Sequence, residues 1–509
     1  MHVAWLIGLL ALLVPVASWS QETSDRWPMS EVEALRLVLG EHPRLAGPQK
    51  GVDAAQRSVD GSDATQPWLF SASAEYTHQD RPIRDAFSRG MQIQDSFVWS
   101  VAFAKTWEFG LELVLALDNT VSRSETPLVL ALNGAEVKQR RLTGPFNFSV
   151  LSASLTQHLL KGASQVVNSL PQQRAELELS AAQLEVARQR NQVLYEALTA
   201  YWELQRAEAA LELRRKSVGY VRQQQEIVDE LIDAGTTARI EADFVEQQLV
   251  TAQDAVALAE LSRDLRELEL RQALALPADE QMKILPTTPM SVPAKRQETL
   301  EDMTTEVIET SQDLQAARQR LAMQELEVIR SAEETEPTLD LTARIAQQGL
   351  DDQLGLSDGF MLDAYRQIAL IEFGAVSFGA IFSMPLDNDY AEAAAESAEI
   401  EYTKVEAEVK LLENQTALRV ASSYRTLDST HSRLALLDKS VDLAKRNLET
   451  GQERYAAGHI ASLELMRLQE ELEGAEVQRL NTQIDLVLRD LELDSLSGRL
   501  LERFGVVEP

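Results

Sequence analysis

The sequence predicts an α+β protein made of two internal repeats, each of which joins β-strands to a very long helical hairpin. Residues recur at a constant offset of 223 positions, as in the pairs Tyr201 and Tyr424, Gly235 and Gly458, Glu241 and Glu464, and Leu249 and Leu472. A match without gaps at one offset is the expected result of an internal duplication. Apolar residues recur every seven positions in some segments and every second position in others, which distinguishes helices from strands.

The period of seven lies in the second part of each repeat. It comprises Leu204, Leu211 and Val218 in the first repeat and Leu427, Leu434, Val441, Leu448 and Tyr455 in the second. A sustained period of seven is typical of long helices packed side by side. We therefore expect four long helices, over residues 172–234, 240–274, 391–456 and 462–501.

Alternation of apolar and polar residues predicts strands over residues 68–77, 97–103, 109–117, 147–157, 338–347 and 373–384. Alternation over about ten residues suits a tilted membrane strand with one face toward lipid. It also suits a half-buried strand of a soluble sheet, and the pattern leaves both interpretations open. Shorter helices are expected over residues 30–60 and 298–331, and the polar stretch 122–145 is expected to connect strands.

The predicted domains are a signal peptide over 1–20, a first repeat over 21–276, a linker over 277–297 and a second repeat over 298–509. The apolar run from Val3 to Trp19, followed by Ser20, is typical of a secretory signal peptide. The linker contains four prolines and few periodic apolar residues. No later segment is apolar over some twenty residues, so no membrane-spanning helix is predicted.

The composition of the chain excludes several classes of functional site and partner. The hydrophobic content of 45% is that of a folded protein. The absence of cysteine excludes disulfides, thiolate-bound zinc and thiol catalysis. The formal net charge of −32 argues against nucleic acid as a partner, because binding phosphates requires a basic surface. The acidity fits either solvated helix faces or a lumen that favours cations.

Short motifs point to one family. They are Ala200–Leu204, Gln157–Gly162, Met384–Asn388 and the two turn segments 234–241 and 455–464. Taken with the duplication, the strand pairs and the predicted signal peptide, they resemble the TolC-like outer-membrane efflux protein family over nearly all of the mature chain. Each motif is weak alone, and the combination carries the resemblance.

The resemblance implies a homotrimer in the cell outer membrane, whose strands form one transmembrane β-barrel with four strands from each copy. It also implies that the helices continue the barrel as an antiparallel coiled-coil tunnel through the periplasm. That tunnel would meet a periplasmic adaptor and an inner-membrane pump. Physical reasoning agrees, because the strands of one copy leave two open edges that lipid does not tolerate.

Three features depart from the family pattern. His158 stands where the family usually has proline. The hairpin over residues 97–121 exceeds the usual four strands, and the sequence does not decide whether it extends the barrel wall or projects from it. Arg467 occupies the second acidic position of the second turn, which puts an entrance of paired acids in doubt there.

The candidate functional residues lie at the turns between the long helices. Gly235 and Gly458 permit the left-handed backbone that ends a helix. The resemblance implies that Glu241 and Glu464 line the tunnel entrance, where three copies would form rings of negative charge that select cations. Each carboxylate also suits the first turn of a helix on electrostatic grounds alone. Tyr455 continues the apolar period and so packs in a core, and its family counterpart helps to hold the entrance closed.

The sequence predicts no catalytic residue, metal site or cofactor. Residues 355–359 match the pattern G-x-S-x-G, but they lie in a polar loop without the strand-to-helix elbow that makes such a serine reactive. The six histidines lack metal-ligand spacing, and Asp351, Asp352, Asp358 and Asp363 lack the spacing of an EF-hand.

These observations predict the passive outer-membrane channel of a tripartite efflux system that exports small molecules. Type I protein secretion and metal-ion efflux are alternative cargoes that the residues do not separate. A rival of another class is a soluble periplasmic coiled-coil adaptor or scaffold. A soluble scaffold would explain the long helices, but it would provide no lipid for the apolar faces of the alternating strands.

Overall fold

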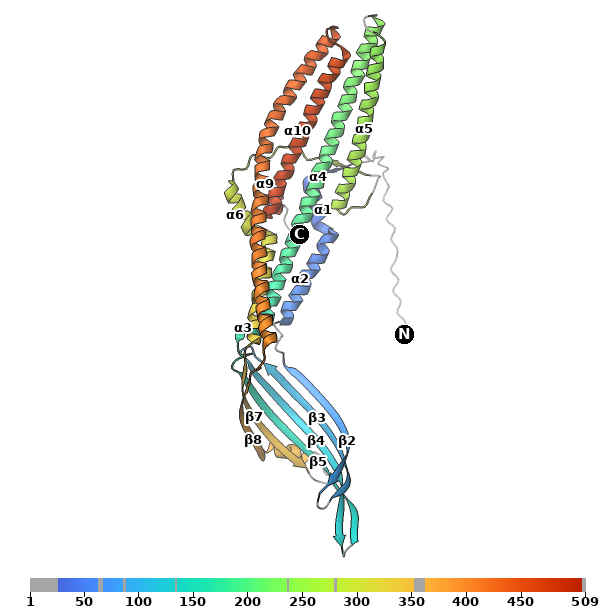
Figure 1. Ribbon diagram of the computed structural model, residues 1–509. Helices are drawn as coiled ribbons and strands as arrows, with labels where there is room; N and C mark the ends of the chain where they lie inside the picture. Colours follow the sequence, from blue (N-terminus) through green and yellow to red (C-terminus); the bar gives the residue numbers. More distant parts are fainter. Residues whose placement is uncertain are drawn as a thin grey trace, which may run out of the picture. The chain divides into compact units, whose positions relative to one another are not determined.

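The chain divides into two compact units. Figure 1 shows the helices and strands that compose them. The computed structural model describes residues 26–62, 67–85, 88–132, 135–235, 238–278, 282–351 and 362–505. Unit 1 comprises Met1–Pro43, Arg190–Leu300 and Ala421–Pro509, and unit 2 comprises Arg44–Gln189 and Glu301–Val420. Each unit therefore takes segments from both predicted repeats.

Four long helices are present at the predicted places. They are α4 (Leu170–Asp233), α5 (Ile240–Ala273), α9 (Asp389–Ala456) and α10 (Ser462–Ser497). In unit 1 their apolar residues form one core cluster, made of Val221, Val228, Val245, Leu448, Tyr455, Leu465 and Leu472. The period of seven thus predicts both the helices and the side chains that hold the two hairpins together.

A tyrosine in each repeat connects a long helix of unit 1 to an extended segment. The Tyr201 hydroxyl donates to the main-chain oxygen of Met29 at 3.0 Å and accepts from the Thr288 N–H at 3.1 Å. Its repeat partner Tyr424 donates to the main-chain oxygen of Glu298 at 2.9 Å. The Tyr201 hydroxyl is buried and requires such partners, so its bond with Thr288 attaches the linker to α4, and the bond of Tyr424 attaches Glu298, which follows the linker, to α9.

Short elements complete unit 1: β1 (Arg26–Met29), β6 (Lys283–Pro286), α1 (Glu31–Glu41) and α11 (Leu500–Phe504). A capping box begins α1, where the Ser30 hydroxyl accepts from the Glu33 N–H and the Glu33 carboxylate accepts from the Ser30 N–H. Strand β6 lies in the predicted linker and pairs in parallel with β1. Four residues are too few to show a period, which is why the sequence did not predict this strand.

Unit 2 contains most or all of five shorter helices: α2 (Pro43–Ser62), α3 (Gln165–Asn168), α6 (Leu300–Thr310), α7 (Gln312–Glu334) and α8 (Leu362–Ala369). The helix expected over 298–331 is divided at Ser311, which is the N-cap of α7. The helix expected over 30–60 is divided at His42, because proline at the next position disfavours helical backbone in the residue before it.

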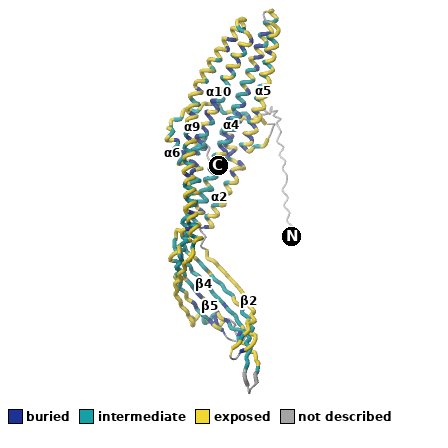
Figure 2. The backbone as a smooth tube through the Cα atoms, viewed as in Figure 1, coloured by how far each residue is buried: buried dark blue, intermediate teal, exposed yellow. Residues whose placement is uncertain are grey.

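The sheet of unit 2 has six strands in the order β2-β3-β4-β5-β7-β8, and every neighbouring pair is antiparallel. The strands are β2 (Leu69–Arg84), β3 (Arg89–Thr106), β4 (Leu111–Leu132), β5 (Ala135–His158), β7 (Thr338–Asp351) and β8 (Phe373–Ser383). The two edges of the sheet are therefore β2 and β8. In Figure 2 both edge strands are drawn as exposed along nearly their whole length.

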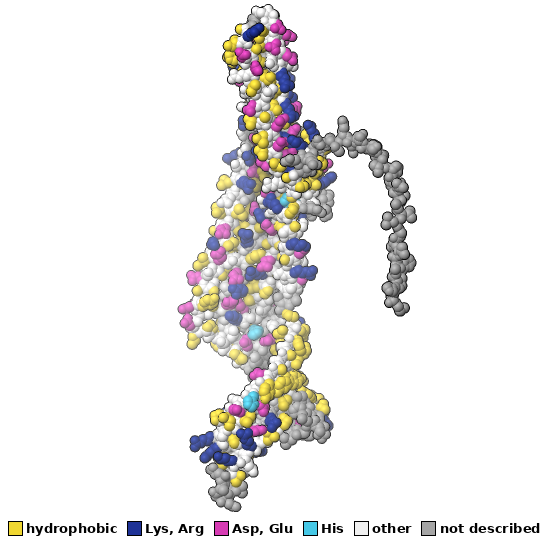
Figure 3. All heavy atoms as spheres, turned by 90° about the vertical axis from the view of Figure 1, so that its right-hand side faces the viewer, with side chains coloured by type: hydrophobic (Ala, Val, Ile, Leu, Met, Phe, Trp, Pro, Cys, Tyr) yellow, Lys and Arg dark blue, Asp and Glu magenta, His cyan; other side chains and the backbone are white. Residues whose placement is uncertain are grey.

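One face of this sheet is apolar and the other carries small or polar side chains. A row of paired residues on the first face consists of Phe70, Phe103, Leu115, Ala153, Ile345 and Val376. The adjacent row, which points to the other face, consists of Ser71, Ala102, Ala116, Ser152, Ala346 and Ala375. Figure 3 shows hydrophobic side chains gathered over the strands of unit 2.

The expectation for residues 122–145 is wrong. This stretch is not a connection, because β4 and β5 continue as a paired arm that runs from Ser124 and Thr143 to Leu132 and Ala135. The arm has no alternation of apolar and polar residues, so the sequence pattern could not reveal it. Main-chain pairing and cross-strand contacts hold it instead, such as the ion pair of 3.2 Å between Arg140 and Glu125.

Within the described ranges, no helix combines the length and the apolar character needed to cross a membrane. Three features of the sequence analysis lie outside those ranges. They are the predicted signal peptide, the G-x-S-x-G pattern at 355–359, and the aspartates Asp352 and Asp358.

Candidate functional site

The candidate site lies at the ends of the two long hairpins in unit 1. Gly235 follows α4 with φ of 71°, and Gly458 follows α9 with φ of 72°. In both turns the glycine N–H donates at 2.9 Å to a carbonyl three residues earlier, from Ile232 or Tyr455. A residue with a Cβ is strained at such angles, so both glycines end their helices as predicted.

Tyr455 is buried and is the polar member of the core cluster. Its side chain is 5% exposed, and its hydroxyl lies 3.2 Å from the Ser462 hydroxyl at the start of α10. The Gln224 amide of α4 donates to the same Ser462 oxygen at 3.2 Å. Three helices therefore meet at one chain of hydrogen bonds. The period of seven predicts the buried position of Tyr455 but not the roles of Gln224 and Ser462, because polar residues in an apolar seam interrupt that period.

Removing the Tyr455 ring is expected to loosen this end of the hairpins. Tyr455→Ala leaves a cavity and costs roughly 3–5 kcal/mol locally, whereas Tyr455→Phe removes one hydrogen bond and costs about 1 kcal/mol. Hydrogen exchange of the amides in residues 448–472 would measure both changes. Tyr220→Phe is the control, because Tyr220 is exposed on α4. Unchanged exchange in Tyr455→Ala would contradict a stabilising role for the ring.

Glu464 is not a free carboxylate. Arg467, one turn further along α10, contacts it at 2.7 Å and also contacts Glu471 at 3.0 Å. The hydrogen bond and charge of Arg467 hold the pKa of the Glu464 carboxyl below its ordinary value. Glu464 thus stays ionised, while the adjacent guanidinium offsets its charge.

Glu241 has a different environment. It lies in the first turn of α5 and lines a groove of about 540 Å³ between α5 and α10. Phe244 lines the same groove from α5, and Ser462 and Leu463 line it from α10. The structure thus brings Glu241 and Ser462 to one groove, and Ser462 connects that groove to Tyr455. Glu464 does not line this groove.

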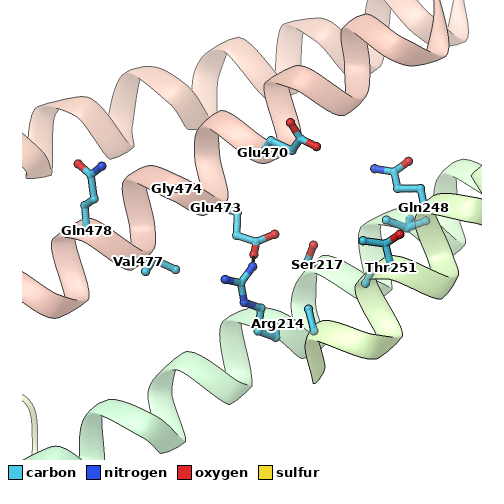
Figure 4. A pocket seen from close by; sticks show the side chains of 12 residues that line it. Arg214, Ser217, Gln248, Thr251, Glu470, Glu473, Gly474, Val477 and Gln478 are labelled. Atoms are coloured by element: carbon cyan, nitrogen blue, oxygen red, sulfur yellow. Dashed lines mark ion pairs between the residues drawn. The ribbon is translucent and has the colours of Figure 1, made fainter. Parts of the chain in front are cut away.

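A second pocket of about 470 Å³ lies further from the turns, between α4, α5 and α10. Arg214 of α4 forms an ion pair across it with Glu473 of α10, as Figure 4 shows. Gln248 and Thr251 of α5 and Glu470 of α10 also line it. Its lining mixes polar and apolar side chains from three helices, and the ion pair links α4 to α10 across it. Among the described residues, no group of histidine and acidic side chains gathers as metal ligands do.

Comparisons with known proteins agree with this geometry. Residues 304–499 match the profile of the family described as outer membrane efflux protein. No curated protein sequence matches the chain. Solved structures that share its fold include the following three. The outer membrane protein VceC from Vibrio cholerae is 15% identical with a TM-score of 0.61, and the alignment covers 93% of this chain and 99% of VceC.

The other two structures are similar at comparable levels. CusC, described in connection with transmembrane channel formation, is 10% identical with a TM-score of 0.64, over 97% of this chain and 99% of CusC. The CmeC outer membrane channel of Campylobacter jejuni is 11% identical with a TM-score of 0.59, over 96% of this chain and 94% of CmeC. At such identities the likeness concerns the fold.

Proposed function

Residues 304–499 match the outer membrane efflux protein family, and on that basis we propose that the chain lies in the outer membrane as the passive channel of a tripartite efflux system. In this proposal three copies assemble into a β-barrel that continues as a helical tunnel through the periplasm. The channel catalyses no reaction, and a partner supplies the energy.

The observation that carries the proposal is the two-faced sheet with open edges. Its apolar face fits the hydrocarbon of a bilayer, and its face of serine and alanine side chains fits a water-filled lumen. The edge strands β2 and β8 have unpaired main-chain groups that lipid cannot satisfy. Further copies of the same sheet would satisfy them.

The helices of unit 1 support assembly independently. Leu258, Leu261, Leu265 and Leu268 of α5 are all about half exposed or more, and they follow the three-and-four spacing of a coiled-coil seam. The repeat offset relates Leu261 to Ile484 and Leu268 to Leu491 of α10, and those two side chains are buried within the chain. The α5 seam therefore lacks the cover that its repeat counterpart has, and a neighbouring copy would supply it.

The exposed apolar residues at the hairpin ends fit the predicted contact with a periplasmic adaptor. Ile240, Phe244 and Leu463 are exposed there beside the charged groups of the candidate site. Small molecules are the proposed cargo, with type I protein secretion or metal-ion efflux as the alternatives. A soluble coiled-coil scaffold is the rival of another class, and the apolar face of the sheet argues against it.

Purification and electrical recording would test the channel. We expect the protein to require detergent, to have the mass of a trimer in mild detergent, and to conduct ions across a planar lipid bilayer. Recovery as a monomer in the soluble periplasm, without conductance, would favour the scaffold and refute the channel.

The charge selectivity of the channel tests the proposed role of the two glutamates. If three copies place Glu241 at the entrance, Glu241→Gln is expected to reduce the cation-to-anion permeability ratio by roughly two-fold or more. Glu464→Gln is expected to have a smaller effect, because Arg467 already offsets its charge. Reversal potentials in asymmetric salt would measure both ratios. Glu449→Gln, which removes an exposed charge from α9 away from the turn, is the control. If all variants had the same cation-to-anion permeability ratio, neither glutamate would contribute to the charge selectivity of the channel.

A further inference from the structure

The strands β3 and β4 form a hairpin that lies inside the sheet and not beside it. We propose, on the basis of the trimeric channel above, that this hairpin is part of the barrel wall. Three copies of the six-stranded sheet would then close a barrel of eighteen strands. Four strands from each copy, as the family resemblance implies, would give a narrower barrel.

The hydrogen-bond ladders place the hairpin between its neighbours. β2 pairs with β3 along its whole length, from Leu69 with Ala104 to Arg84 with Arg89. β4 pairs with β5 without interruption from Leu111 with Gln157 to Ser122 with Phe146. A hairpin that projected from the wall would leave β2 to pair with β5, and both of these ladders would be lost. The observed order has no β2–β5 pair.

The side chains of the hairpin repeat the pattern of the rest of the sheet. On the apolar face, β3 presents Phe97, Trp99, Val101 and Phe103, and β4 presents Leu113, Leu115 and Leu117. The register aligns these residues with the apolar residues of β2 and β5. On the other face the hairpin presents small or polar residues that include Ser100, Ala102 and Ala116. Asn119 interrupts the apolar face and accepts from the hydroxyls of Ser149 and Tyr365. A segment that projected into water would not need apolar residues matched to its neighbours.

The number of strands in each copy also permits three copies to close a barrel. All five strand pairs are antiparallel, so β2 and β8 run in opposite directions. When β8 of one copy pairs with β2 of the next, that pair is antiparallel too, and the alternation continues around the ring. An even number of strands in each copy is required for this, and six satisfies it. The occupant of each open edge is therefore the opposite edge of a second copy.

A wider lumen follows from the larger number of strands. Barrel diameter increases roughly in proportion to strand number, so the cross-section would be about twice that of a barrel with four strands from each copy. Barrels with sixteen to eighteen strands leave an aqueous channel. The channel would accommodate bulkier solutes at the outer membrane than the narrower barrel would.

The chain has no cysteine, which makes single cysteines on β3 a direct test. Ala102→Cys faces the proposed lumen and Val101→Cys faces the proposed lipid. In liposome-reconstituted trimers we expect a charged, water-soluble thiol reagent to modify Ala102→Cys and reduce its single-channel current. Val101→Cys should resist modification and keep its current. The matched pair on β5 is Ser152→Cys, expected to behave as Ala102→Cys, and Leu151→Cys, expected to behave as Val101→Cys.

The outcomes distinguish this inference from the channel on which it rests. Modification of both β3 variants without any change in current, while the β5 pair behaves as expected, would show a projecting hairpin and overturn the inference alone. Electron cryo-microscopy of the unmodified trimer gives an independent count, and a wall with four strands from each copy would overturn it equally. A monomer that does not conduct would refute the channel itself.

Discussion

Replacing Leu261 and Leu265 of α5 by aspartate is expected to convert the trimer into monomers. Both side chains are more than half exposed in one copy, at 57% and 52%. Burying a leucine contributes roughly 1.5–3 kcal/mol, so the pair would contribute about 3 kcal/mol or more to each interface between copies. Two aspartates in the same seam would add unpaired buried charges, and three interfaces would carry this loss.

The repeat identifies the surface that covers this seam. Within one copy, α10 packs on α4, where Arg206 pairs with Asp485 at 2.7 Å. The repeat offset relates α10 to α5 and α4 to α9. The equivalent contact therefore joins α5 of one copy to α9 of the next. Leu436 and Leu443 of α9 are exposed with the spacing of seven that such a contact requires.

Mass photometry or native mass spectrometry in detergent would measure the change. The control is a double variant, Gln253→Asp with Ser262→Asp, which adds two charges to exposed positions of α5 outside the seam. That variant should remain trimeric. A trimer of unchanged stability in the leucine variant would mean that the seam faces solvent or another partner, and the assembly proposed above would then depend on the sheet alone.

The long helices could be predicted to within about four residues because each contributes many turns to one period. Their buried positions follow from the same period, as Leu204 and Leu427 show. The turns were predictable because Gly235 and Gly458 occupy repeat-related positions, where a left-handed residue must follow a helix. The repeat therefore located most of the candidate site before any contact was known.

Other features have no such period. The arm over 122–145 has charged and polar residues on both faces, so main-chain pairing and cross-strand contacts define it and no period reveals it. Strand β6 is too short to alternate, and the hydrogen bonds of Gln224 and Ser462 depend on residues far apart in the chain. The ion pair between Glu464 and Arg467 follows from helical spacing, since residues three apart share a face. Sequence periods thus predict the helices and most of the strands. Contacts between residues far apart in the chain determine which hydrogen-bond and ion-pair partners the polar groups have.

The most consequential of these polar contacts is a buried ionic cluster at the end of α5. The Glu267 carboxylate accepts from Arg263 at 2.5 Å, from Arg271 at 2.9 Å and from the main-chain N–H of Ile284 at 3.0 Å. The side chains of Glu267, Arg263 and Arg271 are each less than 10% exposed. Arg263 also contacts Glu208 and Asp264, each at 3.0 Å, so Glu267 shares Arg263 with these carboxylates, pairs with Arg271 and holds β6 of the linker against α5.

Glu267→Ala is expected to lower the free energy of unfolding by roughly 3–5 kcal/mol, because it removes the carboxylate that pairs with the buried Arg271, whereas Arg263 keeps its contacts with Glu208 and Asp264. Glu267→Gln retains an acceptor for the Ile284 N–H and should destabilise less. Glu269→Ala is the matched control on the same helix. Glu269 pairs with Arg266 at 2.6 Å, but its side chain is 52% exposed, and exposed pairs contribute about 1 kcal/mol or less.

Urea unfolding of the purified trimer, followed by far-ultraviolet circular dichroism, would rank the three variants. Hydrogen exchange at Ile284 would report the local consequence, since its amide loses its carboxylate acceptor in Glu267→Ala. We expect faster exchange there and in the last two turns of α5, while the turns at Gly235 and Gly458 keep their protection. If Glu267→Ala and Glu269→Ala had equal urea midpoints, water would have to solvate Arg271 as well as the carboxylate does, and the cluster would not stabilise the linker.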